Sequence, residues 1–305
     1  MTVTEGPLEW LALARGTLDR VALKRRDDAW LAAAWADPGT RVLVVQDGRS
    51  LVTHEPEPAL VLLAPDRAPD GDRWLLGVDD DGTAYFGVPG ELPVIEGAAP
   101  AGLRRVGAVL PDRDSGLLTH AVALEHWHRT NRFCPRCGAE TAVTAAGHVR
   151  VCPQDGSQHF PRVDPAVIML VTDADDRILL ARGPQWPADR RSILAGFVEP
   201  GESLEQAVAR EVEEEVGLAV RDVRYLGSQP WPLPQSLMLG FTATADGTVP
   251  LRPDPEEILD AAWYTRDELR AAIEAGEIVA PGVLSIAAQL IMRWYGGELP
   301  GMPAF

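Results

Sequence analysis

The segment from Gly196 to Leu218 constrains this chain more than any other part of its sequence, because it combines helix-end signals with an unusual placement of acidic residues. It reads GFVEPGESLEQAVAREVEEEVGL. Ser203 followed by Gln206 is the capping-box pattern that begins a helix, and Gly217 suits the residue that ends one. The sequence therefore predicts a helix over residues 203–216.

The predicted helix carries glutamates on its apolar side. Side chains step by about 100° around a helix. One side thus collects the apolar residues Leu204, Ala207, Val208 and Val212. Glu211 and Glu215 project to that same side, with Glu214 at its edge. Carboxylates packed together in this way repel each other and lose hydration unless a cation lies among them. Because oxygen ligands suit Mg²⁺ and Mn²⁺, we expect a divalent-metal site here.

The same segment resembles the Nudix box of the Nudix hydrolases at every fixed position, from Gly196 through Glu202 to the run REVEEEVGL at 210–218. The resemblance implies an α/β fold, an α/β/α sandwich with a mixed sheet. It also implies hydrolysis of a nucleoside diphosphate linked to another group, with a metal-activated water attacking phosphorus.

The resemblance assigns metal ligands and a catalytic base. The implied ligands of Mg²⁺ or Mn²⁺ are Glu211, Glu214, Glu215, Glu257 and the backbone carbonyl of Ala195. Glu215 is our first choice for the base and Glu214 the alternative. Read without the resemblance, Glu257 is a surface acid in the acidic loop that begins at Asp254.

Two further roles follow from the same resemblance. Glu202 pairs with Arg210 to brace the loop against the helix. Gly196 and Gly201 let the loop bend close to the phosphates, since glycine has no Cβ.

A proline-rich segment, Ser228-Gln-Pro-Trp-Pro-Leu-Pro-Gln-Ser236, follows the box. Alternating prolines fix the backbone and remove donors, so we expect a rigid, extended piece that presents Gln229, Trp231 and Gln235. The segment resembles the SQPWPFPxS motif of the NADH pyrophosphatase (NudC-type) branch, which implies recognition of NAD(H). Leu233 stands where that branch has phenylalanine.

The branch resemblance implies a set of substrate-binding residues. They are Phe160, Phe197, Gln229, Pro230, Trp231, Pro232, Leu233, Pro234, Gln235, Ser236 and Ala287. Phe160 and Phe197 are implied to sandwich a nucleobase or nicotinamide at a dimer interface. Taken without the resemblance, each of these lone aromatics would more often be a core residue.

A cysteine segment precedes the catalytic region. Cys134 and Cys137 form a C-x-x-C closed by glycine, and Cys152 follows. This pattern predicts a structural Zn²⁺ site. Asp155 stands where a fourth cysteine is expected and is our preferred fourth ligand. The alternatives are His159 or His148, or a site that has lost its metal.

Arginines accumulate around this segment. In residues 129–162, Arg129, Arg132, Arg136, Arg150 and Arg162 face only Glu140 and Asp155. Two interpretations stay open: a solvated ribbon surface, or a patch that guides phosphates to the active site.

Length and pattern indicate an N-terminal α/β domain at 1–128, a zinc ribbon at 129–161 and a catalytic domain at 162–305. The expected strands are 41–46, 59–63, 74–78, 84–88, 166–171, 178–181, 221–228, 236–245 and 261–264, and the expected further helices are 117–130 and 283–295. The acidic hairpin expected at 170–183 has an echo at 74–88. The first domain is thus either a degenerate, catalytically silent Nudix copy or a domain with a similar hairpin.

Composition excludes several other classes of protein. The N-terminus has no signal-peptide pattern, the longest apolar runs are strand-length, and three cysteines do not make a disulfide framework. We therefore expect a cytoplasmic protein with no membrane partner. The formal net charge of −17 disfavours a long nucleic-acid footprint.

These observations lead to one expected function and two alternatives. We expect metal-dependent hydrolysis of NADH or NAD⁺ to nicotinamide mononucleotide and AMP, by an enzyme that the resemblance implies is a homodimer. The first alternative is removal of NAD caps from RNA by the same chemistry. The second is a non-catalytic nucleotide sensor, which the intact glutamate cluster disfavours.

Overall fold

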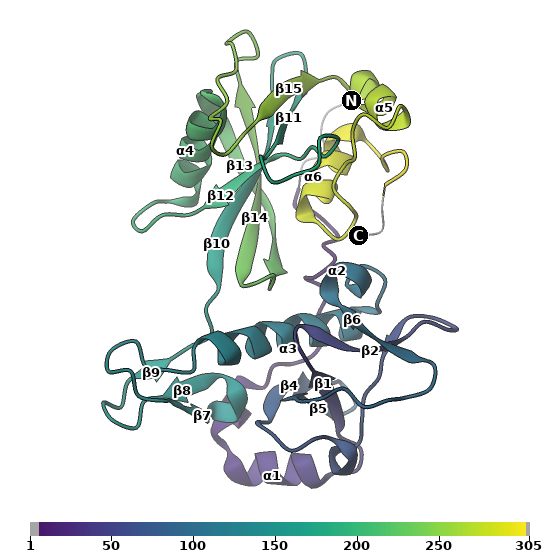
Figure 1. Ribbon diagram of the computed structural model, residues 1–305, viewed down its shortest axis with the longest axis vertical. Coiled ribbons are helices and arrows are strands. Elements are labelled where there is room, and N and C mark those ends of the chain that lie inside the picture. The colour runs from purple at the N-terminus through teal and green to yellow at the C-terminus, as the bar shows by residue number, and fades with distance from the viewer. Residues whose placement is uncertain (1–5, 303–305) are drawn as a thin grey trace. The chain divides into compact units, whose positions relative to one another are not determined.

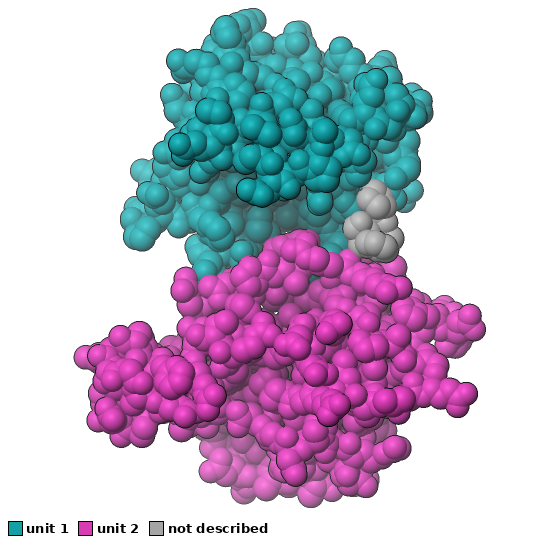
Figure 2. All heavy atoms as spheres, in the orientation of Figure 1, with its two compact units in different colours: residues 1–14, 164–230, 236–305 teal, residues 15–163, 231–235 magenta. Residues whose placement is uncertain are grey.

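The computed structural model describes residues 6–302, which form two compact units (Figures 1 and 2). Unit 1 contains residues 6–14, 164–230 and 236–302, and unit 2 contains residues 15–163 and 231–235. Unit 1 includes the glutamate-rich helix and unit 2 includes the cysteine segment.

Unit 1 is a mixed sheet with helices on both faces. Its elements are β10 (Asp164–Thr172), β11 (Ile178–Arg182), β12 (Leu194–Phe197), α4 (Leu204–Val216), β13 (Val220–Trp231), β14 (Ser236–Ala245), β15 (Asp260–Tyr264), α5 (Arg266–Glu274) and α6 (Ile286–Tyr295). The strand order is β13-β14-β10-β11-β15, and β12 pairs with β10. Strand β10 runs parallel to β14 and antiparallel to β11 and β12.

The central strand β10 is buried on both faces, which explains its unbroken apolar sequence. Because successive side chains of a strand point to opposite faces, Val167, Met169 and Val171 join the core beneath α4. Ile168 and Leu170 join the core beneath α6. The α/β/α sandwich expected from the sequence is confirmed (Figure 1).

Helix α4 has the ends that its sequence predicts. Ser203 accepts a hydrogen bond from the Gln206 backbone N–H, the Gln206 side chain accepts from the Ser203 N–H, and Gly217 closes the helix in the left-handed conformation. The buried residues are Ala207, Val208, Glu211, Val212, Glu215 and Val216. The capping box and the apolar side with its two glutamates are therefore both confirmed.

Unit 2 contains three small sheets around one long helix. Its elements are η1 (Ala22–Arg26), α1 (Asp28–Ala36), β1 (Arg41–Val45), β2 (Arg49–Thr53), β3 (Ala59–Leu60), η2 (Pro65–Arg67), β4 (Trp74–Val78), β5 (Ala84–Pro89), β6 (Ala98–Gly102), α2 (Leu103–Val106), α3 (Asp112–Thr130), β7 (Ala142–Thr144), η3 (Ala145–Gly147), β8 (Val149–Val151) and β9 (Gln158–His159). The sheets have the orders β1-β5-β4, β3-β2-β6 and β7-β8-β9. The third is the ribbon that carries the cysteines.

Several expected boundaries in unit 2 were wrong. The strand expected at 59–63 is only Ala59–Leu60, and Leu63 forms an isolated bridge with Val42. Helix α3 begins at Asp112, five residues before the expected start. Its first turn contributes buried Asp114, which accepts a hydrogen bond from the Leu60 N–H at 2.9 Å. The pattern of apolar residues around Asp112 cannot predict this contact, because its partner Leu60 lies 54 positions away from Asp114 in the chain.

His128, a buried residue of helix α3, packs against the ribbon. The His128 ring stacks on Trp74 with ring centroids 5.1 Å apart. Its Nδ1 lies 3.0 Å from Nη1 of Arg150, which can only donate. His128 Nδ1 must therefore accept, and its Nε2–H donates to the Gly147 carbonyl at 2.8 Å. Burial, with Arg150 adding to it, lowers the pKa of His128 to about 4.

We expect acid to destabilise the protein partly through His128. The folded-state pKa lies below the ordinary value of 6.5, so the stabilising contribution is complete above pH 6.5 and is lost as pH falls toward 4. The difference is on the order of 1–3 kcal/mol at pH 4. Denaturant unfolding of wild type and His128→Gln at pH 7, 5.5 and 4 measures it. The variant should lose less stability between pH 7 and 4 than wild type, and equal losses would contradict the assignment of a neutral, buried His128.

No helix within residues 6–302 is both long enough and apolar enough to cross a membrane.

Candidate active site

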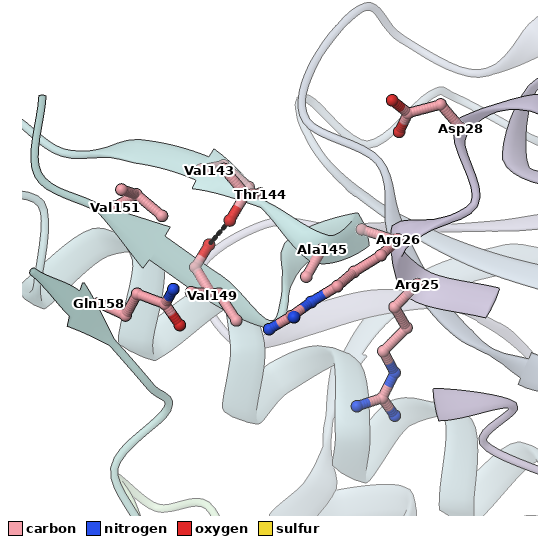
Figure 3. A pocket seen from close by; sticks show the side chains of 10 residues that line it. Arg25, Arg26, Asp28, Val143, Thr144, Ala145, Val149, Val151 and Gln158 are labelled. Atoms are coloured by element: carbon pink, nitrogen blue, oxygen red, sulfur yellow. Dashed lines mark hydrogen bonds between the residues drawn. The ribbon is translucent and has the colours of Figure 1, made fainter. Parts of the chain in front are cut away.

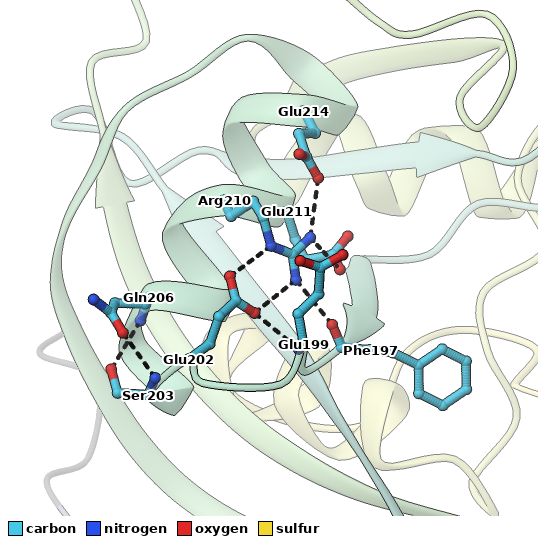
Figure 4. Close-up of polar contacts among 8 residues, drawn as sticks. All are labelled: Phe197, Glu199, Glu202, Ser203, Gln206, Arg210, Glu211 and Glu214. Carbon is cyan, nitrogen blue, oxygen red and sulfur yellow. Dashed lines mark hydrogen bonds and ion pairs between the residues drawn. The ribbon is translucent and has the colours of Figure 1, made fainter.

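Arg210 lies at the centre of the polar network on helix α4 (Figure 4). Its Nε and Nη2 donate to the two carboxylate oxygens of Glu202 at 2.7 and 2.9 Å, so the expected brace is present. Nη2 also donates to the Phe197 carbonyl at 2.9 Å. Nη1 donates to Glu211 and Glu214, each at 2.9 Å. One guanidinium thus ties the loop, strand β12 and two glutamates together.

The brace keeps Glu202 ionised. The Arg210 hydrogen bonds, and then the Glu199 backbone N–H, lower the pKa of Glu202 to about 2. The same partner raises the pKa of Arg210 further. The pair is therefore charged at neutral pH, which suits a structural clamp.

Three carboxylates from two elements converge beside this network. Glu211, Glu215 and Glu257 each offer an oxygen, and these oxygens all lie within 4.8 Å of one another. Glu211 and Glu215 are buried, whereas Glu257 is exposed. Glu257 comes from the loop after β14, whose Arg252 and Asp254 backbone N–H groups donate to the carbonyls at the end of α4. Those two hydrogen bonds hold the loop against α4 and so place the Glu257 carboxylate, which is far from the helix in sequence, beside Glu211 and Glu215.

The cluster is electrostatically strained without a cation. Burial raises the pKa of Glu215 to about 8, and the neighbouring glutamates Glu211, Glu257 and Glu214 add to the rise. Burial also raises the pKa of Glu211, against the opposing effect of Arg210. One buried oxygen of Glu215, Oε2, has no hydrogen-bond partner among residues 6–302. An oxygen-only donor set with an unsatisfied buried oxygen fits a hard divalent cation.

Gly196 makes room for this cluster. A Cβ added at Gly196 would lie 1.9 Å from Cδ of Glu211 and 2.0 Å from its Oε1. No side chain other than hydrogen fits there without moving the carboxylate. The expected role of Gly196, a close approach of the loop to phosphates, stays a prediction. The structure shows a second role: the absence of a Cβ leaves the space that the Glu211 carboxylate occupies.

We expect Gly196→Ala to lower kcat by at least about a hundredfold, because a displacement of about 1 Å at a catalytic group has that effect. The matched control is Gly297→Ala, the same substitution at an exposed glycine of the same unit, where an added Cβ would meet nothing within 4 Å. Circular dichroism should show both variants folded. Wild-type kcat in Gly196→Ala would mean that the Glu211 position does not matter for turnover.

The other expected ligands lie at the edge of the cluster. Glu214 is exposed and bonded to Arg210, and its oxygens are not in the group of three. Ala195 lies on β12, paired with Ile168 of β10. Phe197 is 59% exposed, and its ring points away from the glutamates (Figure 4). Phe160 is also 59% exposed, so neither aromatic is a core residue.

The segment at 228–236 is extended only in part, so the expectation of one extended piece holds for residues 228–231 and is wrong for residues 232–235. Strand β13 continues to Trp231, residues 232–235 form a turn, and β14 begins at Ser236. Pro230 lies within β13, whereas Pro232 and Pro234, which lack the N–H groups needed to extend a strand pair, lie in this reversal. Trp231 is half-buried, with the Arg104 guanidinium 5.6 Å from its ring centroid.

Gln229 is not presented to a substrate, and that expectation was wrong. Its side chain is completely buried. Oε1 accepts from the Leu13 N–H at 3.3 Å, and Nε2 donates to the Leu284 carbonyl at 3.0 Å. The amide is fully occupied in joining the N-terminal segment and the loop before α6 to the sheet.

We therefore expect Gln229→Ala to lower the free energy of unfolding by about 1–3 kcal/mol, since it leaves two buried main-chain groups unpaired. KM for the substrate should stay within about twofold. Exposed Gln185 of the same unit provides the control Gln185→Ala. Unchanged stability with a raised KM would restore the original interpretation of Gln229 as a contact residue.

Ala287 differs from its expected position as well. Its methyl group is buried in the core with Ile286 and Leu290. The side chain therefore cannot touch a substrate, and a main-chain contact stays a prediction.

The cysteine segment forms two equivalent turns. Cys134 accepts a backbone hydrogen bond from Gly138, and Cys152 accepts one from Gly156, with both glycines left-handed. Asp155 occupies in the second turn the place that Cys137 has in the first. The ligand atoms of Cys134, Cys137, Cys152 and Asp155 all lie within 4.8 Å of one another.

The two histidines that were alternative zinc ligands are not members of this group of four. His159 Nε2 lies 3.1 Å from the Ser157 hydroxyl, and His148 Nε2 lies 3.1 Å from His120 Nε2. Hydrogen bonds from the Ser157 hydroxyl and N–H lower the pKa of Asp155, so this carboxylate is ionised and able to bind a metal.

The arginines around the ribbon do not form one free patch. Arg150 is buried and bonded to Thr141 and His128. Arg129 pairs with Asp47 at 3.0 Å and Arg132 with Glu140 at 2.6 Å. The interpretation of residues 129–162 as a phosphate-guiding patch is therefore not supported by the contacts of these three arginines.

Trp186 is a candidate functional residue that the sequence analysis missed. A Cβ on Gly183 would lie 3.6 Å from the Glu257 carbonyl oxygen and 3.9 Å from the Trp186 ring. The ring is 37% exposed, and the Arg190 guanidinium lies 5.4 Å from its centroid. The available signal was an aromatic residue between prolines in the loop that follows β11.

Comparison with known proteins agrees with this arrangement. The NUDIX domain family model matches residues 162–281, the NADH pyrophosphatase zinc ribbon domain matches 129–160, and the NADH pyrophosphatase-like rudimentary NUDIX domain matches 39–127. The last match agrees with the hypothesis of a degenerate first copy.

Relatives extend the match over nearly the whole chain. A Mycobacterium bovis protein named NAD-capped RNA hydrolase NudC is 44% identical over 300 residues, covering 94% of this chain and 95% of its own. A Deinococcus radiodurans protein of the same name is 46% identical over 192 residues, covering 59% and 68%. Among solved structures, a Nudix hydrolase from Nitrosomonas europaea has a TM-score of 0.44 and 22% identity, covering 57% of this chain and 96% of its own.

The chain therefore belongs to the Nudix hydrolases. Within that family it belongs to the NADH pyrophosphatase (NudC-type) branch, which the zinc ribbon and the rudimentary domain define.

Proposed function

We propose that this chain hydrolyses the pyrophosphate bond of NADH or NAD⁺ to nicotinamide mononucleotide and AMP. The observation that carries the proposal is the convergence of Glu211, Glu215 and Glu257, with an unsatisfied buried oxygen on Glu215. The choice of NAD(H) rests on the branch to which the chain belongs.

Mg²⁺ or Mn²⁺ is the proposed cofactor, held by Glu211, Glu215 and Glu257, with Glu214 and the Ala195 carbonyl as the outer ligands. When bound, such an ion neutralises charge on the pyrophosphate and lowers the pKa of a water molecule. Arg210 fixes the orientation of Glu211, and Gly196 leaves the space that this carboxylate needs.

Glu215 is the proposed base. Its buried carboxylate belongs to the group of three and its Oε2 has no partner among residues 6–302, so this oxygen is free to take a proton from a water molecule in the site. Glu214 is the weaker candidate, because its carboxylate is exposed and already accepts from Arg210.

Exposed aromatic residues are the proposed contacts for the substrate rings. Phe197 and Phe160 present their faces to solvent, and Trp231 presents a half-buried ring. Pro230, Pro232, Leu233, Pro234, Gln235 and Ser236 are proposed as further substrate-binding residues on the basis of the branch resemblance. We further propose a homodimer, a cytoplasmic location and domain limits at 1–128, 129–161 and 162–305.

One Zn²⁺ per chain is proposed to bind Cys134, Cys137, Cys152 and Asp155. Four protein ligands leave no open position, so the ion would be structural. The equivalence of the two glycine-closed turns supports Asp155 over His159.

Removal of NAD caps from RNA is the second candidate function, because the relatives that match most of the chain are named NAD-capped RNA hydrolases. The bond is the same, so the carboxylate cluster serves both reactions.

The test measures kcat/KM for NADH, NAD⁺, ADP-ribose and an NAD-capped RNA of defined length, in Mg²⁺ and in Mn²⁺. The proposal expects kcat/KM for NADH or NAD⁺ to exceed kcat/KM for ADP-ribose by at least about tenfold. Equal kcat/KM values would mean that the enzyme has a general Nudix activity with no preference for NAD(H). A capped RNA that exceeds both dinucleotides would favour the second candidate.

A further inference from the structure

A hollow in unit 2 has the properties of a second anion site. It has a volume of about 510 Å³ and lies between the start of the chain's first helices and the ribbon (Figure 3). That volume is in the range of small-molecule pockets, about 300–1,000 Å³. Its lining is Arg25, Arg26, Asp28, Val143, Thr144, Ala145, Ala146, Val149, Val151 and Gln158.

The two arginines of the hollow have no carboxylate partner among residues 6–302. Their neighbour Lys24 does, since it pairs with Asp27 at 3.3 Å. Arg25 donates only to the Arg20 carbonyl, at 3.4 Å, and its buried Nε has no partner. Burial and the nearby Arg20 lower the pKa of Arg25. In a chain with a formal net charge of −17, unpaired arginines side by side are unusual.

The two arginine side chains of the hollow diverge from one helix. In Figure 3 the Arg26 side chain reaches toward Val149 of β8, whereas the Arg25 side chain runs in a different direction. Asp28 points away from both guanidinium groups. The hollow thus combines two cations with one separate carboxylate, for a net charge of +1 from these three residues.

Strained backbone frames the hollow on two sides. Val21, which precedes η1, has φ 37°, and Ala145 and Ala146 of η3 have φ 47° and 46°. Left-handed conformations are unfavourable by about 1–2 kcal/mol for residues with a Cβ, and most of all for a β-branched one. Such strain concentrates at ligand sites. Gly147 anchors the second turn, because a Cβ there would lie 2.4 Å from the Trp74 ring.

The lining also indicates the kind of anion. Guanidinium pairs bind phosphate oxygens through charge-assisted hydrogen bonds. Val149 and Val151, on one face of β8, add an apolar surface against which a base or ribose can pack, and Asp28 can accept from a ribose hydroxyl. The strongly negative chain disfavours a long polyanion.

From these observations we propose that the hollow lined by Arg25 and Arg26 binds a mononucleotide through its phosphate. The site uses residues of unit 2 only and does not rest on the function proposed for the carboxylate cluster.

The test is equilibrium binding of AMP, adenosine, inorganic phosphate and a ten-nucleotide RNA to wild type and to Arg25→Gln/Arg26→Gln. Because AMP is also a proposed product, binding is measured in a Glu215→Gln background and without added divalent metal. The double substitution should weaken AMP binding by at least about tenfold per arginine. When the same double substitution is made in protein that keeps Glu215, kcat and KM for NADH should stay within twofold of wild type. Adenosine and inorganic phosphate should each bind at least about tenfold more weakly than AMP.

Matched variants keep the result interpretable. Arg67→Gln removes the same charge from an exposed position of unit 2 and should leave AMP binding unchanged. Arg25→Lys/Arg26→Lys retains the charge and should retain weaker binding. AMP should raise Tm in wild type and in Arg67→Gln, but not in the Gln double variant. Equal AMP affinity in wild type and the Gln double variant, or equal affinity for adenosine and AMP, would overturn the proposal. An RNA that binds more tightly than AMP and loses that affinity in the double variant would overturn the assignment to a mononucleotide.

Discussion

Glu215→Gln is expected to lower kcat by at least about a thousandfold, which corresponds to about 4 kcal/mol of transition-state stabilisation. Glu215 is buried with Glu211 and Glu257 near it, and its Oε2 has no partner. A neutral amide of the same shape can neither balance a divalent ion nor accept a proton. Steady-state kinetics at saturating metal measure the effect.

Two controls separate chemistry from folding. Glu213→Gln alters an exposed glutamate of the same helix and should keep wild-type kcat. Glu215→Gln itself should be the more stable protein at pH 9 without added divalent metal. A carboxyl whose folded pKa is raised to about 8 loses its stabilising contribution as pH rises through that value, and the amide does not titrate. A variant that keeps a tenth of wild-type kcat would show that the role of Glu215 is assigned wrongly.

Cys134→Ser should have the largest effect on stability. Structural zinc contributes its binding free energy directly to folding, and Cys134 is a buried member of the four-ligand group. We expect zinc content to fall from about one per chain to near zero and the free energy of unfolding to fall by more than about 3 kcal/mol. Elemental analysis and denaturant unfolding measure the two quantities.

The fourth ligand can be tested in the same experiment. Asp155→Ala should lose zinc, whereas His159→Ala should retain it, because Asp155 belongs to the group of four and His159 does not. Folded, active wild-type protein with no zinc would mean that the site has lost its metal. Zinc loss in His159→Ala alone would move the fourth ligand to the histidine.

Helix α4 could be predicted from sequence because its determinants are local. The capping box spans Ser203 to Gln206, Gly217 ends the helix, and periodicity places Glu211 and Glu215 on the buried side. Strands such as β10 and β14 were also found, since each is long and apolar over most of its length. The short strands of the ribbon, two or three residues each, carry too little pattern to be recognised.

What sequence reasoning could not supply depends on contacts between distant residues. Gln229 looked like an exposed motif residue, yet its partner Leu13 is 216 positions away in the chain. The position of Glu257 beside Glu215 requires the backbone hydrogen bonds from Arg252 and Asp254 to helix α4. It was expected from family resemblance and not from any local signal. The clash that excludes a side chain at Gly196 likewise appears only when the helix is packed on β12.

The most direct test of the central claim is identification of the products formed from NADH in ¹⁸O-labelled water, with Mn²⁺, by wild type and by Glu215→Gln. The account predicts reduced nicotinamide mononucleotide and AMP in equal amounts, with one ¹⁸O in a phosphate of one product, and almost no product from the variant. Release of free nicotinamide with ADP-ribose, or equal turnover by the two proteins, would contradict it.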